Sequence, residues 1–380
     1  MRIGILTQPL HYNYGGIMQT WALQQVLKEM GHEPIKIDWF GSQDTITVKR
    51  FFILLLSWFK TLGAKAIGRK KYVGLASPYK HIFRHDQIRC VDRKFNKLIK
   101  STRRIYSKDE LKRIVEELNL DAFIVGSDQV WRQVYCPDIE IFFLGFLSDS
   151  DKRTRISYAA SFGTSDTDID DNKRIECIHL LHLFKSVSVR ENSGVNIVRN
   201  IFGRNDVVQT LDPTLLIGTD EYRRLVGHNT SKEDNPFIAA YILDPNDEKN
   251  TILNDLSATL GHKTRIMTCN PDNGLDMPPV SQWIKNLADS DFVVTDSFHG
   301  CVFAIIFKKS FIAIGNEWRG LDRFKSLLEL FELYNRLITN IDDYRIRKVE
   351  LLSSINYDNV YRKLEGLRKN SLNYLKDALA

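Results

Sequence analysis

The chain has 380 residues, of which 43% are hydrophobic and 26% are charged. This composition excludes a disordered chain and suits two domains of ordinary size, each with its own core. The formal net charge of +6 is a local feature, because residues 45–85 hold nine bases and no acid, and subtracting those nine charges leaves the remainder at −3.

The five cysteines are scattered without a CxxC pair, and no secretory signal opens the chain. We therefore expect a reducing, cytoplasmic setting with neither a disulfide framework nor a metal site. Residues 166–171 carry the DxD spacing of some metal-dependent transferases, but they follow no clear strand. A solvated loop is the favoured interpretation of that run.

The first elements predict a Rossmann-type β-loop-α-β unit. Residues 2–7 have the pattern of a buried strand, residues 17–30 that of an amphipathic helix and residues 33–38 that of a second strand. The intervening loop contains Asn13, Gly15 and Gly16, and its glycines would let the backbone approach an anion. Because GxGxxG is absent, a dinucleotide site is not favoured.

A basic aromatic segment follows at residues 45–85. Its apolar run is much shorter than the ~20 residues that span a bilayer. Aromatic residues beside clustered lysines and arginines within residues 49–71 are nevertheless typical of a helix that lies in a membrane interface. The alternative is a core helix with a solvated basic end.

Several predicted strands end in small and polar residues. The strand at residues 122–125 leads to Asp128 and the strand at residues 186–189 leads to Arg190. A strand at residues 291–294 leads to Thr295–Gly300, which contains His299. Since ligands bind at the carboxyl ends of parallel strands, these residues are candidates for one site.

The repeated pattern predicts an α/β fold with two Rossmann-like, doubly wound domains facing a cleft. Residues 1–225, which include the basic aromatic segment, form the first domain and residues 235–345 the second. Residues 346–380 form a C-terminal helical tail that we expect to pack back across the first domain.

Each candidate side chain has a functional and a structural interpretation. His299 can transfer protons near neutral pH, or it can be a hydrogen-bonded core residue. Arg190 can clamp a carboxylate or phosphate, or form a surface ion pair. Asp128 can act as a base or orient a sugar hydroxyl, or merely cap a turn. Arg319 and Arg323 follow the last predicted strand of the second domain and are expected to face the same cleft.

Six short motifs in one order resemble the polysaccharide pyruvyl transferase family over most of the chain. They are NYGG at 13–16, GSDQVW at 126–131, YAASFG at 158–163, SVREN at 188–192, LDPTLL at 211–216 and TDSFHG at 295–300. Two departures are Arg132, where an Asn is expected, and Ser297, where some members carry an Arg.

The resemblance implies two domains arranged as in GT-B glycosyltransferases, with the acceptor on the first and the donor on the second. It implies transfer of pyruvate from phosphoenolpyruvate to two hydroxyls of a sugar in a cell-surface or exopolysaccharide precursor, which forms a cyclic ketal and releases phosphate. The implied residues fall into three groups: His299, Asp128 and Asp296 for proton transfer; Arg190, Ser297, Gly300, Arg319 and Arg323 for the donor; Asn13, Gly15, Gly16 and Trp131 for the acceptor or its loop.

The implied partners are phosphoenolpyruvate and a sugar or lipid-linked oligosaccharide acceptor, with no cofactor, metal or nucleic acid. Residues 49–71 would then hold the enzyme at the inner face of the cytoplasmic membrane. Two alternatives remain, because fold does not determine function. One is a glycosyltransferase with a nucleotide-sugar donor, and the other is a non-catalytic scaffold of a glycan assembly complex.

Overall fold

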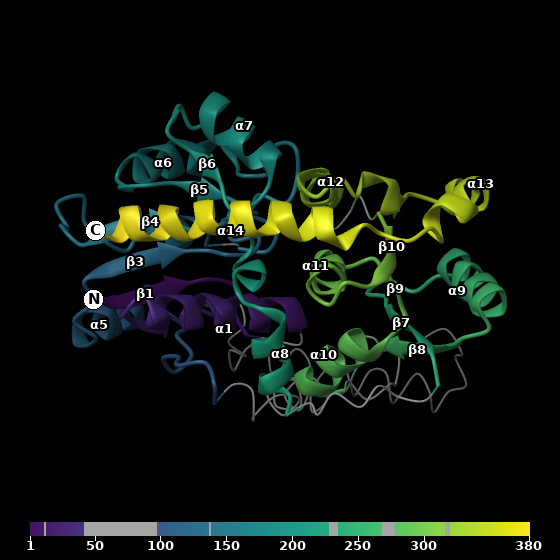
Figure 1. Ribbon diagram of the computed structural model, residues 1–380. Coiled ribbons are helices and arrows are strands. Elements are labelled where there is room, and N and C mark those ends of the chain that lie inside the picture. Colours follow the sequence, from purple (N-terminus) through teal and green to yellow (C-terminus); the bar gives the residue numbers. More distant parts are fainter. Residues whose placement is uncertain (11–12, 42–96, 137, 228–234, 268–277, 316–319) are drawn as a thin grey trace, which may run out of the picture.

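The computed structural model describes residues 1–10, 13–41, 97–136, 138–227, 235–267, 278–315 and 320–380. The predicted membrane-contact segment 49–71, with the rest of residues 45–85, and the candidate Arg319 lie outside the described residues. Figure 1 shows two lobes, each built on a sheet with helices on its faces, and a long C-terminal helix that joins them.

The first lobe contains a four-stranded parallel sheet with the order β2-β1-β3-β4. Parallel bridges from β4 and the loop after it lead to a two-stranded sheet, β5-β6. The strands are β1 (Arg2–Leu6), β2 (Glu33–Lys36), β3 (Ala122–Val125), β4 (Thr154–Ser157), β5 (Ser188–Val189) and β6 (Val208–Gln209). All four residues of β3 are buried, as expected for a parallel strand with both faces covered.

Helices and 3-10 turns of the first lobe connect these strands. They are α1 (Tyr14–Glu29), α5 (Lys108–Glu117), η2 (Ile139–Phe143), α6 (Asp171–His182), α7 (Asn192–Asn200), η3 (Pro213–Leu216) and α8 (Thr219–Leu225). Helix α1 begins three residues earlier than predicted, because the Asn13 side chain accepts a hydrogen bond from Gly16 N at 3.1 Å and caps it. Gly15 and Gly16 are therefore helical residues rather than loop residues.

The second lobe contains a five-stranded parallel sheet with the order β11-β10-β9-β7-β8. Its strands are β7 (Phe237–Tyr241), β8 (Lys263–Met267), β9 (Phe292–Thr295), β10 (Ser310–Ile314) and β11 (Leu337–Ile338). Its helices are α9 (Asp247–Leu260), α10 (Val280–Asp289), α11 (Phe298–Ile306), α12 (Leu321–Leu330), the 3-10 turn η5 (Tyr334–Arg336) and α13 (Ile341–Leu351). The predicted break between residues 345 and 346 falls inside α13, whose Tyr344 hydroxyl donates to Asp255 on α9 at 2.5 Å.

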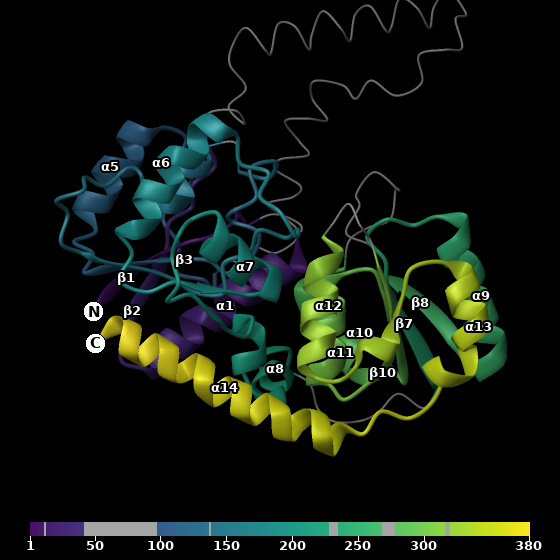
Figure 2. The same cartoon turned by 90° about the horizontal axis from the view of Figure 1, so that it is seen from above.

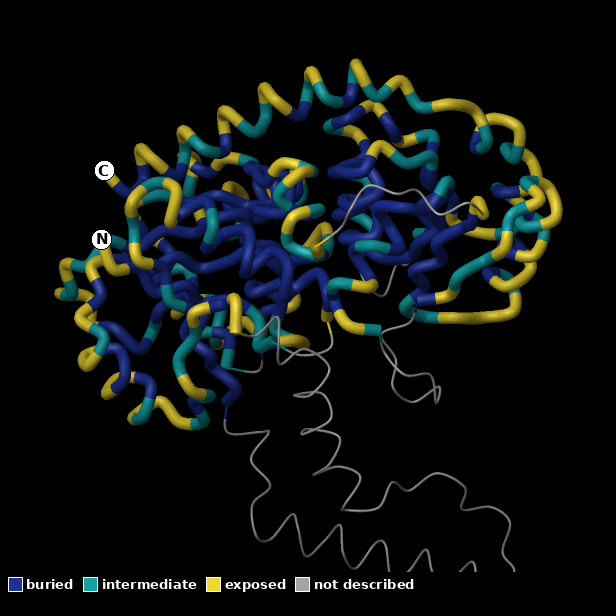
Figure 3. Tube along the Cα trace, turned by 60° about the horizontal axis from the view of Figure 1, so that its bottom comes forward, coloured by how far each residue is buried: buried dark blue, intermediate teal, exposed yellow. Residues whose placement is uncertain are grey.

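An apolar core joins the lobes along one side. Tyr14 at the start of α1 packs on Trp283 of α10 with ring centroids 5.2 Å apart, and Trp283 packs on Phe303 of α11 at 4.9 Å. These side chains belong to one buried cluster that includes residues of both sheets. Figure 3 shows the buried residues continuing from one lobe into the other.

Helix α14 (Tyr357–Leu379) crosses from the second lobe back over the first, as Figures 1 and 2 show. The Tyr374 hydroxyl donates to Ser157 O at 2.8 Å, and the Ser371 hydroxyl accepts from Leu211 N at 3.0 Å. The predicted return of the C-terminal helices is confirmed. No helix in the described ranges combines the length and apolar character needed to cross a bilayer.

Candidate active site

Arg190 follows β5 directly and is fully buried between the lobes. Its Nη1 donates to Asp212 Oδ2 at 2.9 Å, while Nη2 lies 3.7 Å from Asp128 Oδ1 and Nε lies 3.8 Å from Glu191 Oε2. Its guanidinium carbon lies 4.3 Å from the centre of the Phe298 ring, which belongs to the opposite lobe. Burial would lower the pKa of Arg190, but the carboxylates of Asp212, Asp128 and Glu191 raise it.

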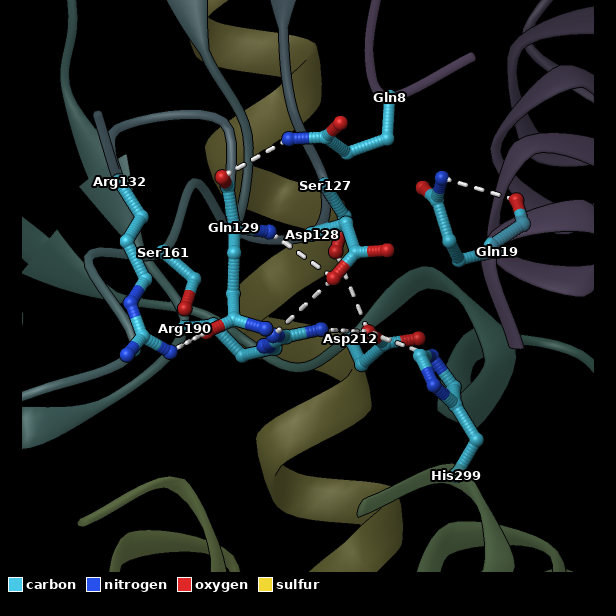
Figure 4. Close-up of polar contacts among 12 residues, drawn as sticks. Gln8, Gln19, Ser127, Asp128, Gln129, Arg132, Ser161, Arg190, Asp212 and His299 are labelled. Atoms are coloured by element: carbon cyan, nitrogen blue, oxygen red, sulfur yellow. Dashed lines mark hydrogen bonds and ion pairs between the residues drawn. The ribbon is translucent and has the colours of Figure 1, made fainter. Parts of the chain in front are cut away.

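Asp212 is the acid at the centre of the polar cluster in Figure 4. Its Oδ1 accepts from the hydroxyl and backbone N–H of Thr214 at 2.7 and 3.1 Å, and Oδ2 accepts from Ser127 Oγ at 3.1 Å as well as from Arg190. Burial alone would raise the pKa of Asp212, but His299, Arg190 and the hydrogen bond from Thr214 hold it well below its usual range. The carboxyl group is therefore negatively charged near neutral pH.

His299 comes from the second lobe, in the first turn of α11, and is 5% exposed. Its Nε2 lies 3.5 Å from Asp212 Oδ2 and has no hydrogen-bond partner among the described residues. Helix α11 begins at Phe298, so His299 is fixed by a helix and not by a loop. A Cβ at residue 15 would overlap the imidazole ring, which explains why the facing position of α1 is glycine.

Asp128 lies beside Arg190 in a left-handed backbone conformation with φ of +77°. Such values are uncommon outside glycine and are frequent at functional sites. One carboxylate oxygen accepts from its neighbour Gln129 N at 2.9 Å, and the other accepts from Asn13 Nδ2 at 3.5 Å. The predicted residues Asn13 and Asp128 thus meet at the start of α1.

Glu191 and Asp212 are the two site residues to which the sequence analysis assigned no role. Glu191 Oε1 accepts from Ser161 Oγ at 2.8 Å and from the backbone N–H groups of Phe162 and Gly163 at 2.9 and 3.0 Å. It therefore shapes the loop after β4. The sequence feature that could have identified Glu191 and Asp212 is their position, because each acid comes within three residues after a strand.

Arg323 on α12 brings a second buried guanidinium to the site. Its guanidinium carbon lies 5.7 Å from the centre of the Phe298 ring, on which Arg190 also packs. Burial and the nearby charge of Arg190 lower the pKa of Arg323 to about 10. The site thus holds two guanidinium groups, Arg190 and Arg323, beside the carboxylates of three acids.

Two of the predicted site residues, Asp296 and Trp131, make contacts that stabilise the fold. Asp296 is completely buried, and its carboxylate accepts from Leu243 N at 2.6 Å, Asp244 N at 3.0 Å and Lys249 Nζ at 2.7 Å. It therefore ties the loop after β7 to β9 instead of facing His299. Trp131 is completely buried as well, where its Nε1 donates to Phe142 O and its ring stacks on Phe143. Neither side chain is available to a substrate.

The remaining donor residues surround His299. Ser297 is the N-cap residue of α11, its backbone N–H donates to Thr295 Oγ1 at 3.1 Å, and its own side chain makes no capping bond. Gly300 lies so close to Thr295 that a Cβ would overlap it. Within the described ranges, no three His, Cys, Asp or Glu side chains form a cluster that would hold a metal ion.

Two parallel sheets on either side of a shared buried site define the GT-B-like class, which includes glycosyltransferases and epimerases. A UDP-GlcNAc 2-epimerase from Methanocaldococcus jannaschii matches with a TM-score of 0.52 and 10% identity over 97% of this chain and 100% of that chain. A TarM mutant from S. aureus matches with a TM-score of 0.52 and 11% identity over 100% and 99%. These identities show the fold alone, and they confirm the predicted fold class.

The family model of the polysaccharide pyruvyl transferases matches residues 13–317. The chain therefore belongs to the polysaccharide pyruvyl transferase family, and the predicted resemblance is confirmed. Membership makes the protein a transferase of polysaccharide biosynthesis with a sugar or polysaccharide acceptor. No curated protein matches the chain.

Proposed function

We propose that the protein transfers pyruvate from phosphoenolpyruvate to two hydroxyls of one sugar and forms a cyclic ketal. One observation carries the proposal. A buried guanidinium, Arg190, has two nitrogens without a hydrogen-bond partner in the described part of the chain, and it lies beside the unbonded Nε2 of His299. Buried polar atoms are rarely left unpaired, so these groups suit an anionic substrate that accepts a proton.

The reaction can be written with balanced bonds and protons. The methylene carbon of phosphoenolpyruvate gains a proton as the C=C double bond becomes a single bond. The adjacent carbon gains bonds to two sugar oxygens, and its bond to the phosphate oxygen breaks. The two hydroxyls lose two protons, of which one replaces the proton given to the methylene carbon and the other leaves with phosphate. The chain must therefore supply a proton donor, a proton acceptor and cations for the donor charges.

The residues fit these roles in the following way. Arg190 and Arg323 bind the carboxylate and phosphate of the donor, and the first turn of α11 offers backbone N–H groups to the same anion. His299 gives the proton to the methylene carbon, and Asp212 orients its ring. Asp128 accepts a proton from the attacking hydroxyl, beside Asn13.

The test is release of phosphate from phosphoenolpyruvate in the presence of a panel of nitrophenyl and lipid-linked sugars. We expect sugar-dependent release and a product that carries a pyruvate ketal by mass spectrometry. His299→Ala and Arg190→Ala should each lower kcat/KM by about 100-fold or more.

Matched controls are His179→Ala and Arg224→Ala, whose side chains are exposed and form ion pairs away from the site. Both should retain the wild-type rate. Phosphate release that never depends on a sugar contradicts the proposal. Thermal stabilisation by a nucleotide sugar, but not by phosphoenolpyruvate, indicates a glycosyltransferase instead.

A further inference from the structure

The turn Arg132–Tyr135 presents two apolar side chains to solvent next to the buried site. Tyr135 N donates to Arg132 O at 3.1 Å and closes the turn. Val134 is 63% exposed and Tyr135 is 43% exposed, although Trp131 before them and Cys136 after them are buried. These two side chains are not used by the hydrophobic core.

The turn is nevertheless held firmly by the acidic run at residues 166–171. Asp168 accepts hydrogen bonds from the backbone N–H groups of Gln133 and Val134 at 2.7 and 3.1 Å. The Gln133 side chain donates to Asp170 at 2.6 Å and accepts from Asp170 N at 2.8 Å. The DxD spacing therefore anchors a turn, and four hydrogen bonds fix Gln133 and Val134, the residues just before Tyr135.

The Tyr135 ring lies at the edge of the site. The Arg132 guanidinium carbon is 4.8 Å from the centre of the ring, and Arg132 Nη1 donates to Gln129 Oε1 at 3.0 Å, next to Asp128. Figure 4 shows Arg132 and Gln129 side by side with Arg190. The exposed ring is thus linked through Arg132 and Gln129 to the position next to Asp128.

We propose that Tyr135, with Val134, forms the platform on which the ring of the acceptor sugar packs. This inference rests on the proposed function. A hexose ring presents a face of C–H groups surrounded by hydroxyls, and an exposed tyrosine offers an apolar ring with a polar edge. Because the turn is already ordered, binding loses little conformational entropy. A sugar packed there lies between solvent and Asp128.

The experiment measures sugar binding without turnover. Saturation-transfer NMR is recorded with methyl glycosides of hexoses and N-acetylhexosamines, since a methyl group, unlike nitrophenyl, cannot itself stack on the ring. Tyr135→Ala should weaken glycoside binding and raise the acceptor KM by about 10-fold, with the KM for phosphoenolpyruvate within about twofold. Tyr135→Trp should restore glycoside binding. The matched control is Tyr334→Ala on η5, since Tyr334 is 48% exposed.

Three results would overturn the platform. They are wild-type glycoside binding in Tyr135→Ala, absence of saturation transfer from the wild-type protein to every glycoside, and an unchanged acceptor KM in Tyr135→Ala. The proposed function is decided separately, by sugar-dependent phosphate release from the wild-type enzyme. If the wild-type enzyme releases phosphate only with sugars and Tyr135→Ala has the wild-type acceptor KM, the platform is refuted and the proposed function is not.

Discussion

Replacing Asp212 with asparagine tests the centre of the site, because the shape is kept and one buried charge is removed. Arg190 then loses the carboxylate at 2.9 Å, and the other two carboxylates beside it lie 3.7 and 3.8 Å away. Loss of one partner of a buried ion pair typically costs about 3–5 kcal/mol. Since Asp128 and Glu191 stay close, we expect the lower end, about 3 kcal/mol.

That cost predicts a fall of about 4 °C in the Tm of Asp212→Asn, measured by circular dichroism near neutral pH. The pKa of Asp212 is lowered on folding. The carboxylate therefore contributes fully to the free energy of unfolding above the pKa of an unfolded aspartate, and this contribution is lost as the pH falls through the pKa of the folded state. The Tm difference between the wild type and Asp212→Asn should therefore be largest near pH 7 and should shrink below about pH 4.

The same variant should lower kcat by about 100-fold or more, because the charge that orients His299 is gone. The control is Asp206→Asn, whose partner Arg204 lies at 2.7 Å but whose own side chain is 57% exposed. An exposed pair is worth at most about 1 kcal/mol, so the Tm should change by no more than about 1 °C. A Tm and a rate of Asp212→Asn that match this control would refute the reasoning.

Two further variants separate catalysis from folding. In Gly15→Ala the new methyl group meets the imidazole of His299. We therefore expect kcat to fall by about 10-fold or more, while the urea midpoint of unfolding falls by a smaller factor. Unchanged kinetics would show that the imidazole ring can move freely. Lys249→Met leaves the buried Asp296 without its cation and should cost about 3 kcal/mol in chemical unfolding. At temperatures where Lys249→Met is folded, its kcat should stay within about threefold of the wild-type value. A loss of kcat of about 100-fold would instead indicate that Asp296 takes part in catalysis.

The fold was predictable because each buried strand is short, apolar and followed by polar residues. The pattern correctly located His299, Arg190 and Asp128 at strand ends, and parallel strands bring such ends to one edge of a sheet. Helix starts were less predictable. Asn13 caps α1 and extends it over residues whose glycines indicated a loop, and α11 begins at Phe298 although Ser297 makes no side-chain capping bond.

The partner of His299 could not be found from local sequence. Asp296 lies three residues before His299, yet it bonds to Lys249 and to backbone N–H groups after β7. The acid that faces the imidazole is Asp212, which belongs to the other lobe. Such a pairing depends on how two domains pack, and spacing along the chain carries no information about it.

Helix α14 has a consequence for the order in which the protein folds. Its Ser371 hydroxyl accepts from Leu211 N across 160 positions, and Arg368 Nε donates to Leu215 O at 2.9 Å. The loop that carries Asp212 is therefore completed only when these late residues have been synthesised. Contacts of such long range form slowly, so a nascent chain would assemble both sheets before its reaction centre.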